Sequence, residues 1–191
     1  MEIYNLFPEI HEIRNDNLRE KVSKSLKKAI ALGGWTEDDF KYIPATLLIP
    51  ELISKDYTAQ INLIDHIRAV TQLCINVYDL YSNLGLGDKL NRDELIAGAL
   101  LHDVGKFTEY EKDTSGKIVQ TFEGDRIRHP AMGLEIVSEF DLPIIVRQAI
   151  VFHSKEGDNI NRLPEVDIIH RVDFLCFNPI KKIFEKNKWK L

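Results

Sequence analysis

The chain has 191 residues, of which 44% are apolar and 29% are charged. These values are typical of one globular domain with a short extension, and they exclude a chain that is disordered throughout or a disulfide-stapled mini-protein. The net charge of -5 argues against a general binder of nucleic-acid backbones, which is usually basic, but leaves room for a small phosphorylated substrate.

Features of targeting and redox chemistry point to a cytoplasmic protein. No apolar run approaches the roughly 18 residues of a membrane span, and residues 1–4 lack a basic region followed by an apolar stretch, so we expect neither a membrane partner nor a secretory signal. Cys74 and Cys176 lie among apolar residues and are interpreted as reduced core thiols. The sequence leaves the oligomeric state open, a homo-oligomer included.

The first part of the chain shows helical periodicity and no alternation of strands with helices. The first predicted helix begins at Asp16, ends before Gly33 and carries a stripe at a spacing of four: Leu18, Val22, Leu26 and Ile30. A second, short helix is predicted to begin at Thr36. Residues 42–57 contain two prolines and are interpreted as an irregular connector.

The remaining chain is also predicted to be mostly helical. One helix is expected from Leu63 to about Leu84, and the next from Asn91, which forms a capping-box pattern with Glu94, to about Asp103. Residues 108–125 are polar and are expected to form a loop or a small β-hairpin near 108–122. Further helices are predicted at 129–140, 143–153, 163–177 and 179–187. The predicted fold class is therefore all-α.

Six side chains of metal-ligand type lie on the apolar faces of five predicted helices: His66, His102, Asp103, His129, His153 and Asp173. A single histidine in such a place is usually a satisfied core residue. Six residues of two ligand types indicate a metal site instead, because a cation offsets the cost of burying a carboxylate. Four imidazoles disfavour Mg²⁺ and leave iron, manganese, cobalt, nickel or zinc. His11 lies outside this pattern, and His170 is interpreted as a core residue or a support for a ligand.

In order and context these residues resemble the HD-domain superfamily of metal-dependent phosphohydrolases. The resemblance covers about residues 60–178 and rests on these segments: Asp65-His66-Ile67-Arg68, His102-Asp103-Val104-Gly105-Lys106, Arg128-His129-Pro130, Phe152-His153-Ser154 and Arg171-Val172-Asp173. It implies an HD helical bundle over residues 60–191. Residues 1–59 lie outside the resemblance and are predicted to form an N-terminal helical extension packed on the core.

The resemblance also implies two divalent transition-metal ions, with iron or manganese favoured over zinc, cobalt or nickel. Residues matching the ligands of the first ion are His66, His102, Asp103 and Asp173. Those matching the ligands of the second ion are His129 and His153, with Asp103 bridging. After His153 the chain lacks Gly-Tyr-Pro, so the resemblance does not extend to the HD-GYP branch that opens cyclic di-GMP. It is closer to HD-type hydrolases of diadenosine tetraphosphate and to relatives of cyclic dinucleotide phosphodiesterases.

The expected function is hydrolysis of a phosphoester or phosphoanhydride bond, in a nucleotide-type substrate, by a hydroxide shared between two cations. Asp103 would hold both cations, and Lys106, one helical turn later, would meet the phosphate as a point charge. Arg128 and Lys155, together with Arg126, are further candidates for binding phosphate. The alternative for each of these basic residues is a side chain that only faces solvent.

Two other functions remain open at this stage. Some HD-fold proteins with a similar ligand set are mixed-valent di-iron oxygenases, which dependence of activity on air would reveal. A non-catalytic nucleotide-sensing module would bind a nucleotide without turnover. The sequence does not name the substrate.

Overall fold

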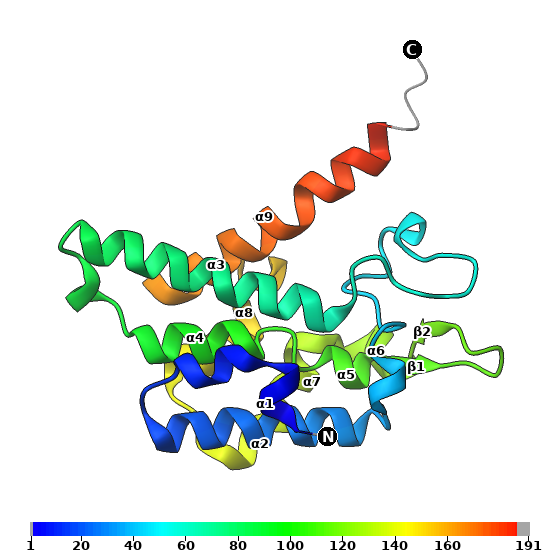
Figure 1. Cartoon of the computed structure of the whole chain (residues 1–191), viewed down its shortest axis with the longest axis horizontal. Helices are drawn as coiled ribbons and strands as arrows, with labels where there is room; N and C mark the ends of the chain where they lie inside the picture. Colours follow the sequence, from blue (N-terminus) through cyan, green and yellow to red (C-terminus); the bar gives the residue numbers. More distant parts are fainter. Residues whose placement is uncertain (1, 187–191) are drawn as a thin grey trace.

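The computed structural model describes residues 2–186 and shows a bundle of α-helices with one two-stranded antiparallel sheet (Figure 1). The α-helices are α1 (Ile3–Leu6), α2 (Asp16–Leu32), α3 (Leu63–Asn83), α4 (Arg92–Leu101), α5 (Lys106–Glu109), α6 (Phe122–Ile127), α7 (His129–Val137), α8 (Ile144–Phe152) and α9 (Pro164–Lys186). The strands β1 (Tyr110–Lys112) and β2 (Ile118–Gln120) form the hairpin. The all-α prediction and the small hairpin are confirmed. Within the described residues, no helix has both the length and the apolarity needed to cross a membrane.

Helix α4 lies at the centre of the bundle. It packs against α2, α3, α8 and α9, and Figure 1 shows it between α3 and α2. Every residue from Leu95 to Leu101 is buried, because a helix with neighbours on all sides has no polar face to expose. The turn that follows α4 therefore opens into the interior of the bundle, which is where His102 and Asp103 lie.

The N-terminal residues share the core of the bundle. Ile3, Phe7 and Leu26 belong to the same buried cluster as Ile96 and Leu100 of α4. We expect this shared burial to couple the stability of residues 2–59 to that of the rest of the chain. The boundary between an N-terminal extension and an HD domain at residues 59 and 60 stays a prediction.

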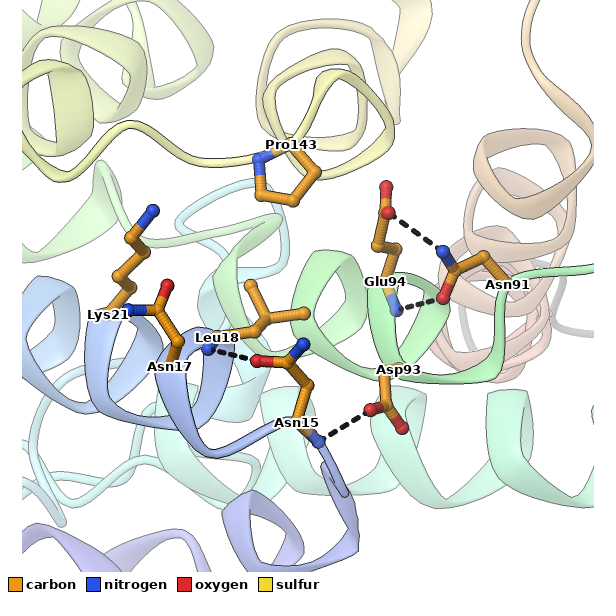
Figure 2. Close-up of a pocket in the computed structure, with 8 residues that line it drawn as sticks. All are labelled: Asn15, Asn17, Leu18, Lys21, Asn91, Asp93, Glu94 and Pro143. Carbon is orange, nitrogen blue, oxygen red and sulfur yellow. Dashed lines mark hydrogen bonds between the residues drawn. The ribbon is translucent and has the colours of Figure 1, made fainter.

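The N-termini of α2 and α4 are joined by hydrogen bonds on the surface, beside a small pocket of about 190 Å³ (Figure 2). The side chain of Asn15 caps α2 by accepting from Leu18 N at 2.9 Å, and Asn15 N donates to Asp93 Oδ2 at 2.7 Å. Asn91 caps α4 as predicted, accepting from Glu94 N at 3.1 Å. Its own backbone N–H donates to Glu165 Oε1 at 2.7 Å, so the reciprocal half of the predicted capping box is replaced by a contact to α9.

Three predicted boundaries were wrong. Helix α4 ends at Leu101, before His102 and Asp103. The polar stretch after residue 105 contains the short helices α5 and α6, which are too short to show a periodic pattern. The segments 163–177 and 179–187 form one helix, α9, with Pro179 inside it. The proline removes one backbone hydrogen bond on an exposed part of the helix, and water can satisfy the freed carbonyl there. Residue 187 lies outside the described residues.

Candidate metal centre

The six predicted ligands converge from five helices. His66 lies within α3 and Asp173 within α9, while His129 is the first residue of α7. His102 and His153 are the capping residues that directly follow α4 and α8, and Asp103 lies in the turn after His102. Helix ends allow side chains to meet at a point without interrupting the packed faces of the helices, which explains why a cluster of polar groups fits inside this apolar bundle.

The first group of ligand atoms surrounds one point. His66 Nε2 lies 3.4 Å from His102 Nε2, 3.4 Å from Asp103 Oδ2 and 3.1 Å from Asp173 Oδ1. His102 Nε2 lies 3.4 Å from Asp103 Oδ2 and 4.0 Å from Asp173 Oδ1. Ligands bound to one ion at about 2.1 Å lie about 3.0–3.4 Å apart in tetrahedral or octahedral arrangements. Four of the five distances fall in this range, and the 4.0 Å between His102 Nε2 and Asp173 Oδ1 is close to the separation of about 4.2 Å between opposite ligands of an octahedral ion.

The second group uses the other oxygen of the same aspartate. Asp103 Oδ1 lies 3.3 Å from His129 Nε2 and 3.5 Å from His153 Nε2. The potential ligand atoms of His66, His102 and Asp103 all lie within 4.8 Å of one another, as do those of Asp103, His129 and His153, so Asp103 belongs to both sets. One carboxylate therefore turns one oxygen to each pair of histidines, which is the arrangement expected of a bridging ligand.

Contacts behind the imidazoles orient their Nε2 atoms. The Nδ1 atoms of His102 and His153 contact the carbonyl oxygens of Ala99 and Ala149, at 2.7 and 2.9 Å. A carbonyl oxygen can only accept a hydrogen bond, so each Nδ1 must carry the hydrogen and donate it. In the neutral imidazole, each Nε2 then keeps its lone pair for a cation. His129 Nδ1 lies 2.9 Å from Glu109 Oε2 instead. Among residues 2–186, neither nitrogen of His129 makes a hydrogen bond of good geometry, which fits a side chain placed to bind an ion.

The charges of the cluster also fit a cation. Burial alone would raise the pKa of the Asp103 carboxyl, but Lys106 and the imidazole of His102 hold it well below its usual range. Burial would also raise the pKa of Asp173, and the hydrogen bond from His66 outweighs it, so that pKa is lowered. Burial lowers the pKa of His129. Burial would likewise lower the pKa of His66 and of His153, but their contacts with Asp103 raise both. The cluster thus keeps its carboxylates ionised, the state in which they bind metal, and a cation would compete with the protons of His66 and His153.

The cluster lies at the base of a cavity of about 600 Å³, within the usual size of a ligand pocket. Lys106, Arg128 and Lys155 all line this cavity. Lys106 Nζ donates to Asp103 Oδ2 and to the carbonyl oxygen of Ala45, both at 2.7 Å, so its side chain faces the cavity and not the solvent. Arg126 does not line it. Its guanidinium contacts Asp125 and the ring of Phe122.

Arg128 has an unusual backbone, with φ 72° and ψ 150°. A residue with a side chain is rarely found there, and the conformation costs about 1–3 kcal/mol. Its guanidinium lies near two carboxylates, at 3.4 Å from Glu109 Oε1 and 3.7 Å from Glu156 Oε1. The strained residue therefore directs a cation to the edge of the cavity immediately before the ligand His129.

Some residues of the cavity were not predicted from the sequence. Glu109, which supports His129, lies in a polar stretch where only its burial at 3% exposure distinguishes it from solvated neighbours. His170 contacts the carbonyl oxygen of His153 through Nδ1 at 2.6 Å and lines the cavity, so it supports a ligand, one of the two interpretations considered. The loop 45–48 and the aromatic residues of α9 had no recognisable motif.

The fold and the cluster define an all-α protein with a buried histidine–aspartate centre able to hold metal. The sequence pattern of the HD domain matches residues 63–176, more than half of the chain, and the chain belongs to this family. The match includes all six predicted ligands.

Curated relatives extend the comparison. The chain is 27% identical to the "3'-5' exoribonuclease YhaM" of Listeria monocytogenes over 94% of this chain and 55% of the relative. It is 27% identical to the "Dihydroneopterin 2',3'-cyclic phosphate phosphodiesterase" of Methanocaldococcus jannaschii over 85% of this chain and 64% of the relative. The chain thus spans only about half to two thirds of the length of these relatives. No solved structure matches it at a significant level.

Proposed function

We propose that the chain is a metal-dependent phosphohydrolase that cleaves a phosphodiester bond in a nucleotide-type substrate, using two transition-metal ions. The observation that carries this proposal is the position of Asp103, whose two oxygens face different pairs of histidines at 3.3–3.5 Å. His66, His102 and Asp173 would hold the first ion with Asp103, and His129 and His153 the second. Iron and manganese suit this mixture of nitrogen and oxygen ligands.

When bound, two such ions would supply Lewis acidity to the phosphoryl oxygens and bring the pKa of a water toward neutrality. The net reaction adds one water across the ester bond: its oxygen bonds to phosphorus, the P–O bond to the leaving group breaks, and the leaving oxygen gains a proton. Lys106 and Arg128 line the same cavity and place positive charge where the phosphate would bind. Glu109 and the carbonyl oxygens of Ala99 and Ala149 hold the imidazoles in place.

The names of the relatives support a phosphodiester as the substrate. One is named an exoribonuclease and the other a phosphodiesterase of a cyclic phosphate. The net charge of -5 still disfavours general binding to nucleic-acid backbones, but a local site for a strand needs only the basic residues around the cavity. The shared feature of both names, a phosphodiester bond, is what we carry over to this chain.

The test is a hydrolase assay with bis-p-nitrophenyl phosphate after anaerobic loading with manganese or iron, with Asp103→Asn as the control variant. We expect turnover that depends on the metal and is lost in the variant. Hydrolysis by neither form, in protein shown to contain two ions, would overturn the proposal. Consumption of O₂ with a reduced organic substrate would identify an oxygenase, and tight nucleotide binding without turnover a sensing module.

A further inference from the structure

The cavity continues beyond the ligand cluster along one face of α9. The residues of α9 that line it are His170, Asp173, Phe174, Phe177, Asn178 and Lys181. Their spacing of three, one, three, one and three residues places them in a single stripe on the helix. Moving outward from the cluster, the stripe presents a ligand, two aromatic rings and a lysine.

The inner part of this stripe is fixed to the ligand cluster. His170 contacts the carbonyl oxygen of His153 at 2.6 Å, and its ring packs against Phe174 with centroids 4.7 Å apart. The outer part lies on the section of α9 that projects from the bundle (Figure 1). The first aromatic ring is therefore held beside the cluster, and Phe177 follows it toward the opening.

An apolar loop also lines the cavity. Leu47 and Leu48 line the same cavity as Phe174 and Phe177. Leu48 is 75% exposed, so its apolar side chain is accessible to a ligand. The loop is joined to the cluster because the carbonyl oxygen of Ala45 accepts from Lys106 Nζ. Leucines and phenylalanines thus add apolar surface to the cavity that contains the candidate phosphate site.

The length of the stripe suits more than one nucleotide. Lys181 follows Asp173 by eight residues, which corresponds to about 12 Å along a helix. Stacked nucleotides advance by about 3.4 Å each, so the stripe has room for more than one stacked base. Aromatic rings in a row, followed by a cation, are the means by which proteins bind single strands without reading their sequence.

We propose that Phe177 and Lys181, together with the loop 45–48, bind the nucleotide beyond the one whose phosphate lies at the cluster, so that the substrate is a single-stranded oligonucleotide. This inference rests on the proposed function and names its substrate class. Phe174, beside the cluster, stacks on the base at the cleaved bond. Phe177 stacks on the next base, and Lys181 meets a neighbouring phosphate. Recognition is tolerant of sequence, because any base presents a face for stacking.

The test compares two substrates in manganese-loaded protein: a fluorescein-labelled tetra-adenylate, and the p-nitrophenyl ester of thymidine 5'-monophosphate, which has one nucleotide only. In Phe177→Ala we expect KM for the tetranucleotide to rise about tenfold, with kcat and the kinetics of the ester within twofold of wild type. Phe177→Trp keeps a ring for stacking and should restore KM. Leu175→Ala, on the exposed side of the same helix, is the matched control and should change neither substrate.

Binding gives a readout apart from activity. With metal removed by chelation, fluorescence anisotropy of the labelled tetranucleotide should show weaker binding by Phe177→Ala than by wild type and Leu175→Ala. Equal effects on both substrates, or no effect on the tetranucleotide, would overturn the inference while the proposed function stands. If wild type cleaves neither substrate, the proposed function fails. The anisotropy measurements then still show whether the stripe on α9 binds a single strand.

Discussion

Asp103 shows why a single residue can organise this centre. It is almost fully buried, at 1% exposure, and it lies within 3.5 Å of the four imidazole Nε2 atoms. Lys106 provides one positive charge at 2.7 Å. An ionised carboxylate in the interior needs such partners, and a shared position between two groups of ligands satisfies both of its oxygens.

The first prediction separates the two groups of ligands. His153→Ala removes a ligand of the second group only, so elemental analysis should show metal content falling toward one ion per chain while circular dichroism shows an unchanged fold. Phosphodiester hydrolysis should fall by orders of magnitude, because one Lewis acid is lost. His11→Ala is the control, since that histidine stacks on Tyr4 outside the cavity. Two ions and full activity in His153→Ala would show that one ion on the first group suffices.

The second prediction concerns Lys106. Lys106→Ala should lower turnover about ten- to a hundredfold, or about 1.4–2.7 kcal/mol, because a positive charge at the phosphate is lost. Metal content should not change, since no ligand is removed. Arg126→Ala carries the same kind of change outside the cavity and should have wild-type kinetics. Steady-state assays of both variants decide the matter, and unaltered turnover in Lys106→Ala would exclude its contact with phosphate.

The six candidate ligands could be predicted from the sequence because polar residues on apolar helical faces are rare, while the residues that contact them from behind could not. Glu109 follows a threonine and precedes a tyrosine in a polar stretch, and nothing local distinguishes it from an exposed glutamate. Its role comes from a contact to His129, twenty residues later in the chain. The backbone strain at Arg128 is likewise invisible, because it arises from how α6 and α7 join.

At the scale of elements, the centre depends on a close crossing between the turn after α4 and the start of α7. A Cβ on Gly105 would lie 1.9 Å from the carbonyl oxygen of His129 and 2.7 Å from Gly133 N. Only a glycine allows the two backbones to approach this closely. The crossing sets the distance between Asp103 on one element and His129 on the other. The close packing of these two backbones therefore explains why the segment from His102 to Lys106 has a glycine at position 105.

The third prediction follows from this crossing. Gly105→Ala should force α7 away from the turn, at a cost of about 1–3 kcal/mol in the free energy of unfolding, and should lower metal content toward one ion as His129 moves. Gly98→Ala is the matched control, because the Cβ there first meets side-chain atoms of Ile169 and Ala149. Urea unfolding measures the stability of each variant, and elemental analysis measures its metal content. An equal loss of stability with two ions kept in both variants would contradict the link between crossing and centre.

Long elements were more predictable than short ones. The apolar stripes of α2 and α3 predicted the first and last residues of these helices to within one residue, because each helix has one buried face. The helices α5 and α6 have four and six residues and depend on caps and tertiary contacts. Pro179 misled the prediction for α9 because a proline usually ends a helix. Its effect depends on the surroundings of one carbonyl, which a sequence does not show.

At the scale of the whole molecule, the candidate centre joins α3, α4, α7, α8 and α9 at one point. These helices otherwise contact one another through apolar side chains, and the core also includes residues 2–59. Ligands from five helices mean that a bound ion favours only the folded chain. The metal and the apolar core should therefore contribute separately to stability, with the core alone able to hold the fold.

The last prediction tests this separation by removing metal. Chelation of both ions should lower the melting temperature by about 10–20 °C, because each ion at a hundred times its Kd adds about 2.7 kcal/mol to stability and each kcal/mol corresponds to about 2–4 °C in a chain of this size. The protein should remain helical after chelation, and adding manganese should restore the higher melting temperature. Asp103→Ala touches both groups of ligands, so this variant should bind neither ion tightly, and its melting temperature should not respond to chelator or to manganese. Calorimetry with and without chelator measures both effects. If wild type that has demonstrably lost two ions melts at its original temperature, the ions do not hold the five helices together, and the cluster of ligands owes its geometry to the apolar core alone.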